Sequence, residues 1–509
     1  MLQKILDTSI ESGILDTNLS LDDFKKRRVQ QTSVVVESCS MKDAVLYMLT
    51  ETEGRSLLVI LTCYNELLSG FSGESISRHK GNKVYYALEC PLDHRNAVQL
   101  RKNIPHTAPS VLSCTRSFGM GDRIGGKASA TPWHVDACQG YDITPVFAQQ
   151  SIRENQKTGR TFLQVLDDAT WAVFQTGFKL PWGADADHLK SPEDLDDAVH
   201  AGFTMFTIDP SDLIDNNADA DSETILKQKL NRLFPNPREI DMFISRYEGR
   251  HTKNDLTVVR SGVKYLSAVR YVVEAYRRLS DLLGESGFNF ELSIDETTTS
   301  TSPLDHRIII GELEHEGVNL FSLAPRFEGA FEKGIDYRGS LDDFRKSLTA
   351  HVTIARERGG YRLSLHSGSD KFSIYPIFGE VTDGFFHVKT AGTSYLEAVK
   401  AAAEADMDLF RRILTLSVET FHINASSYHI SADINRVPRP SEISRDDAIE
   451  LITNNPDVRQ VLHIAFGVVL TQMGDEFKTV LHNNRHLYRD YVVAHIKKHL
   501  ALLTANSSG

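Results

Sequence analysis

Phe290-Glu-Leu-Ser-Ile-Asp-Glu-Thr is the first of four apolar, β-rich segments within residues 290–391 that each end in charged and hydroxyl side chains. The other three are Asn319-Leu-Phe-Ser-Leu-Ala-Pro-Arg, Tyr361-Arg-Leu-Ser-Leu-His-Ser-Gly-Ser-Asp-Lys and Phe385-Phe-His-Val-Lys-Thr-Ala-Gly-Thr-Ser. Stretches with helical periodicity separate them. Alternating strands and helices with polar groups at each strand's carboxyl end are typical of a (β/α)8 barrel. We therefore predict an α/β fold of this TIM-barrel type, with a doubly wound open sheet as the alternative.

The chain is expected to carry a different region on each side of this barrel. Short β-branched or aromatic runs separated by polar turns, such as Leu57-Leu-Val-Ile-Leu-Thr, predict a small α+β region over residues 1–108. The barrel itself is predicted over residues 109–425. Long helical patterns then predict a C-terminal helical cap over residues 426–509.

Two details inside the barrel follow from the same patterns. The first barrel strand is expected to begin near Val111, in the run Val111-Leu-Ser-Cys-Thr-Arg-Ser-Phe. Residues 147–155 and 161–178 are expected to be helical, and residues 211–288 form the longest interval with no strand signal.

Composition limits the possible partners. The 509 residues are 41% hydrophobic and 24% charged, as in an ordinary globular protein. The formal net charge of −12 argues against a nucleic-acid partner, because phosphate backbones are bound by surplus Lys and Arg. No apolar run approaches the roughly 18 residues of a transmembrane helix, and Met1-Leu-Gln-Lys-Ile-Leu lacks a signal-peptide core. We expect a cytoplasmic protein with no membrane partner.

The cysteines do not follow the spacing of a disulfide scaffold or a zinc ribbon. There are five, with no CxxC pair, and all lie within the first 138 residues. Free thiols in a reducing compartment are therefore expected. A metal bound by the carboxyl-terminal half must be held by His, Asp or Glu.

A glycine-rich turn, Ser117-Phe-Gly-Met-Gly-Asp-Arg-Ile-Gly, follows the first predicted barrel strand. A dinucleotide fingerprint needs GxGxxG, whereas these glycines are spaced GxGxxxG, and no acidic residue closes a second strand. We interpret the turn instead as a substrate site. Arg123 would contact an anionic or polyhydroxylated substrate through its planar guanidinium, with Asp122 as a second polar contact.

Two histidines end separate predicted strands. His188 closes Gly183-Ala-Asp-Ala-Asp-His beside Asp187, and His366 ends Leu363-Ser-Leu-His. Imidazoles from two strand ends could meet at the mouth of the barrel and hold a divalent metal with open positions. An N-capping Asp beside a surface His is the alternative for the first pair.

Further charged residues lie at neighbouring strand ends. The paired carboxylates Asp295 and Glu296 could divide into a ligand and a general acid, or could cap the next helix. Lys389 and Thr390 lead into a predicted helix, where backbone N–H groups could hold an anion, although a plain helix cap explains them nearly as well. Lys371 and Arg326 add positive charge for a carboxylate or phosphate.

Several of these strings resemble the tagaturonate/fructuronate epimerase family, which is related to the tagatose 4-epimerases. They include Ser293-Ile-Asp-Glu-Thr, Ser322-Leu-Ala-Pro-Arg-Phe, Phe331-Glu-Lys-Gly-Ile-Asp-Tyr and Leu365-His-Ser-Gly-Ser-Asp-Lys. The resemblance covers about residues 110–425. The chain departs from the family pattern at Ile124-Gly-Gly-Lys-Ala-Ser-Ala-Thr-Pro-Trp-His. A fainter similarity links the Asp-His pair and the later Leu-His to class II ketose-bisphosphate aldolases.

The resemblance implies a metal-dependent C4 epimerase that interconverts D-tagaturonate and D-fructuronate by retro-aldol cleavage and re-addition. His188 and His366 would hold a divalent cation, with Zn, Mn, Ni and Co not distinguished. Asp187 would be the base and Glu296 the acid, and Arg123, Lys371 or Lys389 would bind the substrate carboxylate.

The third metal ligand and the oligomeric state stay open at this point. Glu328, Glu332, His306 and His387 are candidates for that ligand, whereas His351 is expected on a helix away from the mouth. The alternatives for function are a class II aldolase or sugar isomerase on the same metal site, and a sugar-acid sensor without turnover. The expected partner is a small sugar acid.

Overall fold

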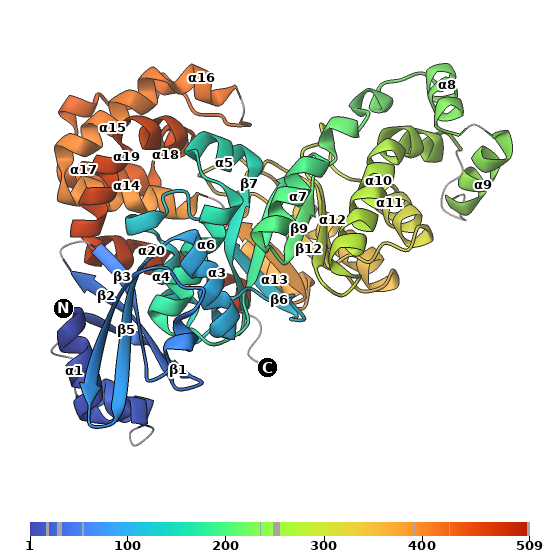
Figure 1. Ribbon diagram of the computed structural model, residues 1–509. Coiled ribbons are helices and arrows are strands. Elements are labelled where there is room, and N and C mark those ends of the chain that lie inside the picture. Colours follow the sequence, from blue (N-terminus) through green and yellow to red (C-terminus); the bar gives the residue numbers. More distant parts are fainter. Residues whose placement is uncertain are drawn as a thin grey trace.

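Eight parallel strands close into a barrel in the order β10-β11-β12-β13-β6-β7-β8-β9 (Figure 1). The structure is a computed structural model that describes residues 1–16, 20–27, 33–52, 55–234, 236–247, 255–390, 392–426 and 428–505; Ala391 lies outside them. The strands are β6 (Arg116–Met120), β7 (Thr144–Ser151), β8 (Gly183–Leu189), β9 (Met205–Ile208), β10 (Asn289–Ile294), β11 (Ser322–Pro325), β12 (Arg362–Leu365) and β13 (Phe386–Thr390). The predicted barrel is confirmed, and the open-sheet alternative is wrong.

The alternation of residues along β10 explains why the barrel interior is polar at one end. Phe290 faces outward and packs on Tyr276, with ring centroids 5.1 Å apart. Glu291 faces inward and is fully buried among side chains from the other strands. Because side chains alternate with period two, Ser293 and Asp295 continue the inward row toward the strand's carboxyl end.

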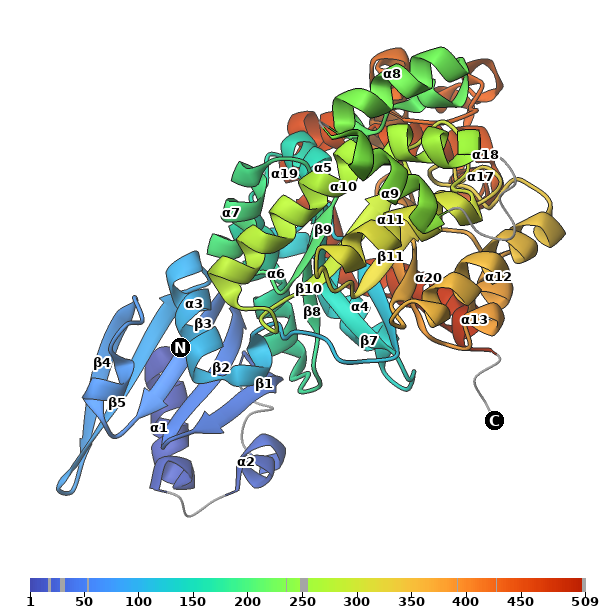
Figure 2. The ribbon, with the colours of Figure 1, turned by 90° about the vertical axis from the view of Figure 1, so that its right-hand side faces the viewer.

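Helices follow the barrel strands and cover the sheet. They are α4 (Thr131–Cys138), α5 (Ile152–Thr158), α6 (Phe162–Thr176), α7 (Pro192–Ala201), α10 (Asp255–Leu283), α11 (Pro303–His315), α12 (Leu341–Glu357), α13 (Tyr375–Val381) and α14 (Thr393–Ala405). Reciprocal capping boxes start α6 at Thr161 and α11 at Ser302. The helices α8 (Glu223–Leu233) and α9 (Pro237–Tyr247) pack on the beginning of α10 and form an arm that projects from the barrel (Figures 1 and 2).

A five-stranded antiparallel sheet precedes the barrel (Figure 2). Its order is β1-β2-β3-β5-β4, from β1 (Val34–Lys42), β2 (Val45–Thr52), β3 (Arg55–Thr62), β4 (Glu74–Lys80) and β5 (Lys83–Pro91). One face of the sheet buries α1 (Leu2–Ser12) and α2 (Leu21–Arg27). The other face packs on α3 (His94–Asn103) and on Trp171 and Phe174 of the barrel helix α6. Because apolar side chains alternate between the two faces, the sheet has a core of its own on one face and is attached to the barrel by the other.

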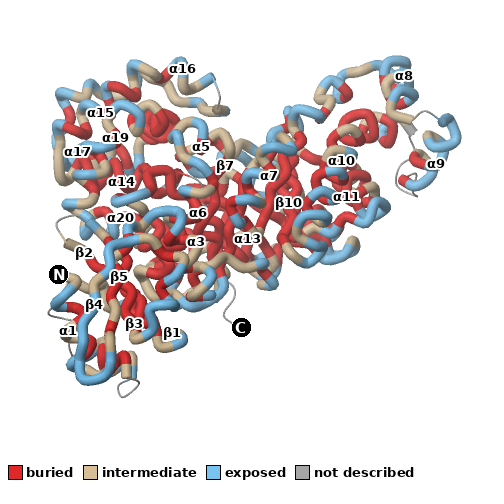
Figure 3. The backbone as a smooth tube through the Cα atoms, viewed as in Figure 1, coloured by how far each residue is buried: buried red, intermediate tan, exposed pale blue. Residues whose placement is uncertain are grey.

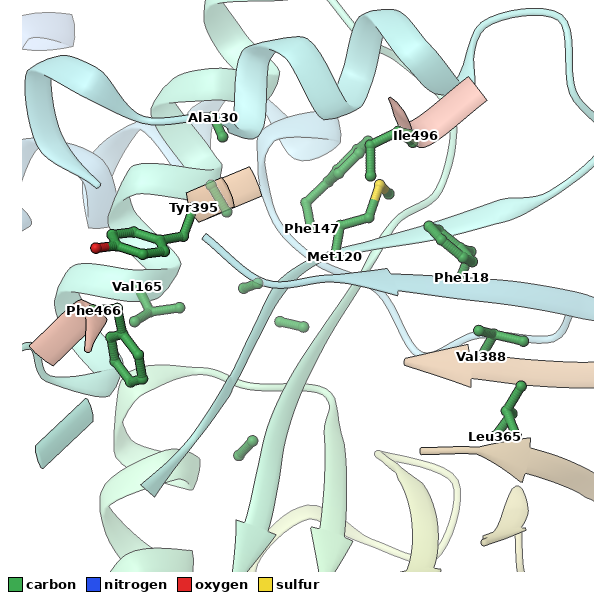
Figure 4. Packing of buried hydrophobic residues seen from close by; sticks show 14 of the residues in the cluster. Phe118, Met120, Ala130, Phe147, Val165, Leu365, Val388, Tyr395, Phe466 and Ile496 are labelled. Carbon is green, nitrogen blue, oxygen red and sulfur yellow. The ribbon is translucent and has the colours of Figure 1, made fainter. Parts of the chain in front are cut away.

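The C-terminal helices share the core of the barrel. They are α15 (Met407–Glu419), α16 (Phe421–Ala425), α17 (Arg445–Asn454), α18 (Pro456–Ile464), α19 (Phe466–Asn483) and α20 (Arg485–Thr504). Tyr395 of α14 meets Phe466 at 6.3 Å between ring centroids, and Ile496 of α20 lies beside Met120 and Phe147 (Figure 4). Buried backbone runs continuously from the strands into these helices (Figure 3).

Two local predictions are wrong. Residues 147–151 belong to strand β7, not to a helix, because the strand passes into α5 at Ser151, whose hydroxyl caps that helix, with no intervening loop. The first barrel strand begins at Arg116, five residues after Val111. All five cysteines are free, as expected. Among the described residues, no helix is long and apolar enough to cross a membrane.

Candidate active site

His188 and His366 meet at the mouth of the barrel, from the carboxyl ends of β8 and β12. Their ring centroids are 5.1 Å apart. Donor atoms of Asp187, His188 and His366 lie within 4.8 Å of one another. His188 has a left-handed backbone with φ of 56°, which a residue with a Cβ adopts rarely and which tertiary contacts must maintain.

A buried carboxylate orients each histidine. The Nδ1 of His188 donates to Asp187 Oδ1 at 2.8 Å, which leaves Nε2 free. The Nε2 of His366 donates to Glu291 Oε1 at 2.6 Å, and its Nδ1 lies 3.4 Å from the Ser293 hydroxyl. This carboxylate–imidazole pattern fixes the tautomer of a metal-binding histidine.

The carboxylate of Asp295 lies beside the second ring nitrogen of each imidazole. Its Oδ1 is 3.8 Å from His188 Nε2 and 3.4 Å from His366 Nδ1. Burial opposes a positive charge on the rings, but the Asp187 and Asp295 carboxylates raise the pKa of His188 well above its usual value. Asp295 and Glu291 likewise raise the pKa of His366. A divalent cation could replace the protons that these carboxylates attract.

Glu296 lies farther out than its neighbour Asp295. Its Oε1 pairs with Arg153 at 3.3 Å, and 36% of its side chain is exposed. A donor atom of Glu296 also lies within 4.8 Å of donors of His188 and Asp209. Asp295 therefore lies beside the histidines, and Glu296 lies at the rim of the cavity.

Lys389 lies at the centre of a buried group of carboxylates rather than at an open anion site. Its Nζ is 2.5 Å from Asp185, 2.9 Å from Asp187 and 2.7 Å from Glu291. Burial opposes its charge, but these three carboxylates raise the pKa of Lys389 well above its usual value. The charge of Lys389 is therefore neutralised by the carboxylates that surround it, and its ammonium holds Asp187 in place.

Two connected cavities open above these groups. The inner one, of about 50 Å³, is lined by Asp187, His188, Asp295, His366, Lys389, Arg123, Arg153 and Lys333. The outer one, of about 640 Å³, shares Arg153, Asp295, Glu296, Lys333 and Tyr428 with the inner one, and adds Arg326 and His429. The C-terminal region thus contributes one wall of the outer cavity.

Other predicted substrate residues serve the scaffold. The Asp122 carboxylate accepts bonds from Ile124 N, Gly125 N and Ala130 N and so shapes the turn. Thr390 donates its hydroxyl to the carbonyl of Gly119 at 2.8 Å. Neither residue lines the two cavities.

Arg123 lines the inner cavity, but its charge is already paired. The guanidinium bonds Glu154 at 2.7 Å from Nε and lies 3.9 Å from the ring centre of Phe466. Gly392, with φ of 79°, allows this packing, because a Cβ there would collide with the guanidinium. The absence of a side chain at Gly392 therefore makes room for the Arg123 guanidinium.

Lys371 is turned away from the cavities. It is fully buried, and its Nζ donates to the carbonyls of Glu332 at 2.9 Å, Ile335 at 2.6 Å and Ser369 at 2.9 Å. A role in binding the substrate carboxylate directly does not fit this geometry. Arg326 does line the outer cavity, and its Nη1 donates to the carbonyl of Asp295 at 3.4 Å.

The four candidates for a third metal ligand lie away from the histidines of the mouth. His306 pairs with His351 behind the barrel, and His387 bonds Ser117 at 2.8 Å inside it. Glu332 accepts from Ser431 and Gln460, and Glu328 lines neither cavity. Asp295 lies closer to both histidines, 3.8 Å from His188 Nε2 and 3.4 Å from His366 Nδ1. As expected, His351 lies on a helix, α12.

The sequence reasoning missed Glu291, Asp185, Lys333 and Arg153. A signal existed for the first two, because they precede Asp295 and Asp187 at even spacings and so face inward on the same strands. Arg153 lies in the first turn of α5 and Lys333 in the loop after β11, where the strand pattern gives no direction for a side chain.

A second group, Asp370, His495 and His499, also has donors within 4.8 Å of one another. It is a structural clamp. Asp370 pairs with Arg459 at 3.0 Å and His495 at 2.9 Å. Its backbone N–H donates to His499 Nε2, while the other ring nitrogen of His499 faces the carbonyl of His495. With both nitrogens of His499 occupied, the group holds the loop that follows His366.

Known proteins share this architecture over nearly the whole chain. The profile of a family described as tagaturonate epimerase matches residues 36–503. The tagaturonate/fructuronate epimerase of Thermotoga maritima is 41% identical over 493 residues, which cover 94% of this chain and 98% of that protein. The similarity extends beyond residues 110–425 into both flanking regions.

Solved structures agree with the sequence relatives. The native fructuronate-tagaturonate epimerase UxaE from Cohnella laeviribosi gives a TM-score of 0.85 at 34% identity, covering 97% of this chain and 99% of that chain. Its complex with one glycerol gives the same TM-score at 35% identity, covering 94% and 98%.

Proposed function

This chain belongs to the tagaturonate epimerase family and is an epimerase, and from that premise we propose that it interconverts D-tagaturonate and D-fructuronate by inverting C4. The observation that carries the proposal is the group of Asp187, His188 and His366 donors within 4.8 Å of one another. The group lies at the carboxyl ends of barrel strands, where TIM-barrel enzymes carry out their chemistry.

The position of C4 in the substrate limits the chemistry. C4 is adjacent to neither the C2 ketone nor the C6 carboxylate, so simple proton abstraction at an acidified carbon does not invert it. We infer a retro-aldol route. A base takes the C4 hydroxyl proton, the C3–C4 bond breaks, and its electron pair forms the enediolate over C2 and C3. The C4 aldehyde turns its other face to C3, the bond forms again, and a proton returns to the C4 oxygen.

The residues at the mouth fit a divalent metal. His188 and His366 each direct toward Asp295 the ring nitrogen that does not bond Asp187 or Glu291. Two imidazoles and one carboxylate are a common ligand set with an open position. When bound, a cation would act as a Lewis acid that polarises the C2 ketone and stabilises the negative charge of the enediolate. The donor set is compatible with Zn, Mn, Ni or Co.

We assign acceptance of the C4 hydroxyl proton to Asp187 and return of a proton to Glu296. Burial opposes ionisation, but His188 and Lys389 hold the pKa of Asp187 well below its usual value, so the carboxylate is charged at neutral pH. Gln149 donates to its other oxygen at 3.1 Å and fixes its direction. Glu296 approaches from the rim beside Arg153, on a different strand end.

Incubating the metal-loaded protein with D-tagaturonate and following D-fructuronate by NMR tests the activity. Substrate deuterated at C4 tests the route, because retro-aldol chemistry never breaks the C4–H bond. We expect retention of the label in ordinary water, little primary isotope effect, and slow escape of three-carbon fragments. Loss of the label to solvent would overturn the route and leave the epimerase assignment intact. Binding without product would instead identify a sensor.

A further inference from the structure

The cations around the two cavities differ in whether a carboxylate already neutralises them. Arg123 pairs with Glu154, and Arg153 pairs with Glu296. Lys389 is surrounded by three carboxylates. Lys333 forms no ion pair with any carboxylate in the part of the chain that the structure describes, and it lines both cavities. An anionic group entering from the outer cavity therefore meets a free ammonium beside the reactive groups.

We propose that Lys333 receives the carboxylate of the substrate and thereby selects a uronate over the corresponding neutral ketose. This inference rests on the proposed function, because it assigns the C6 end of that substrate. The Nζ of Lys333 donates to Ser367 Oγ at 2.7 Å, next to His366 in the chain. The hydroxyl occupies one of three ammonium donors and leaves two for a carboxylate.

The loop that carries Lys333 is held from three sides. Lys371 binds the carbonyls of Glu332 and Ile335, on either side of Lys333. Arg459 donates to the carbonyl of Gly334 at 2.6 Å, and Gln460 donates to the carbonyl of Lys333 at 3.2 Å. A backbone fixed in this way loses little entropy when its side chain binds an anion. Lys371, which the sequence suggested as a direct ligand, instead positions the loop.

The charge distribution supports the same orientation of the substrate. Asp187, Glu291 and Asp295 gather around the histidines, and Lys333 and Arg153 line both the inner and the outer cavity. Burial and the neighbouring Arg153 lower the pKa of Lys333, and the more distant carboxylates of Glu154 and Asp295 offset this only in part. A substrate carboxylate would supply further negative charge.

This placement also suits the proposed cleavage. After C3–C4 breaks, the carboxylate stays on the fragment whose aldehyde must turn before the bond forms again. A salt bridge at C6 would retain the fragment and act as the pivot for that rotation. A neutral ketose has no such anchor and would lose the fragment more often.

The test compares three variants of the metal-loaded full chain, each checked for fold by its melting temperature. Lys333→Met removes the proposed contact, Arg326→Met removes the cation that lines only the outer cavity, and Lys346→Met repeats the first change on α12, where 78% of the side chain is exposed. The substrates are D-tagaturonate and D-tagatose. D-Galactonate and galactitol serve as inert ligands that differ by one carboxylate, with Kd measured by calorimetry.

Lys333→Met should lower kcat/KM for D-tagaturonate about 100-fold, mainly through KM, and change D-tagatose less than about threefold. It should also remove the preference for D-galactonate over galactitol, while Lys346→Met keeps both. An equal loss on both substrates, an unchanged preference, or a selective loss in Arg326→Met would each overturn the assignment. If the wild-type protein does not epimerise D-tagaturonate, the proposed function fails, and the Kd ratio for the inert pair alone decides the role of Lys333.

Discussion

Two pairs of histidines in this molecule have nearly the same geometry and opposite chemical settings. At the mouth, His188 and His366 have ring centroids 5.1 Å apart with an angle of 47° between the rings. Behind the barrel, between α11 and α12, His306 and His351 have centroids 5.0 Å apart at 41°. Proximity of two imidazoles therefore does not define a metal site.

The neighbours of each pair make the difference. Carboxylates surround the mouth pair and raise the pKa of both rings. The helix pair has Tyr361 and apolar side chains around it, and His306 bonds the Tyr361 hydroxyl at 2.6 Å. Burial lowers the pKa of His351 to about 4 and holds that of His306 well below its usual value. Positive charge is favoured at the mouth pair, whereas burial favours the neutral form of the helix pair.

The largest contrast is expected on removing one histidine of the mouth. His366→Ala should lose bound divalent metal and lower kcat/KM by roughly 10³-fold or more, because a Lewis acid contributes several kcal/mol to such a reaction. Metal analysis of the purified protein and a kinetic assay measure both effects. Full metal content in His366→Ala would show that His366 is not a metal ligand. His188→Ala tests His188 in the same way.

A smaller effect is expected from making the mouth pair resemble the helix pair. Asp187→Asn removes the charge beside His188 and the proposed base together. We expect kcat to fall roughly 10²- to 10⁴-fold and metal affinity to fall about 10- to 100-fold. Titration with metal and steady-state kinetics separate the two changes. A variant that mainly raises KM would show that Asp187 positions the substrate and does not move a proton.

The helix pair should respond in stability and not in activity. His351→Leu leaves the Nδ1 of His306 without its 2.9 Å partner, which should cost about 1–3 kcal/mol in the free energy of unfolding. Urea denaturation measures that loss. The kcat of the folded variant should stay within about threefold of the wild type, and a loss of bound metal would contradict a purely structural role.

The smallest effect is expected on the pH dependence of stability, through the neutral pair His306 and His351. The pKa of His351 is about 4 in the folded protein, below its ordinary value of 6.5, so the unfolded chain binds the extra proton first. Stability is therefore intact above pH 6.5 and declines as the pH falls toward 4. Between pH 7 and 5 this residue should account for roughly 2 kcal/mol. Denaturation of His351→Leu at both pH values should show a shallower decline, and equal slopes would disprove the assignment.

The sequence predicted the structure correctly where a local pattern is compatible with only one arrangement of the chain. Inward alternation and polar strand ends predicted the closed barrel and brought His188 and His366 together. The pattern failed at residues 147–151, because a strand that enters a helix without a turn has no boundary signal. Charge at a strand end was also ambiguous. Lys371 follows β12 and Lys389 lies near the end of β13, but only the folded chain shows that carbonyl groups surround Lys371 and carboxylates surround Lys389.

The clamp on Asp370 has a consequence for the order in which the protein is made. All strands of the barrel are complete at Thr390, yet Arg459 on α18 and His499 on α20 fasten the loops beside the histidines. A nascent chain that has emerged from the ribosome only through β13 carries both histidines of the mouth on unfastened loops. The residues that fasten these loops therefore follow the whole barrel in the chain, and the geometry of the site depends on helices made after its strands.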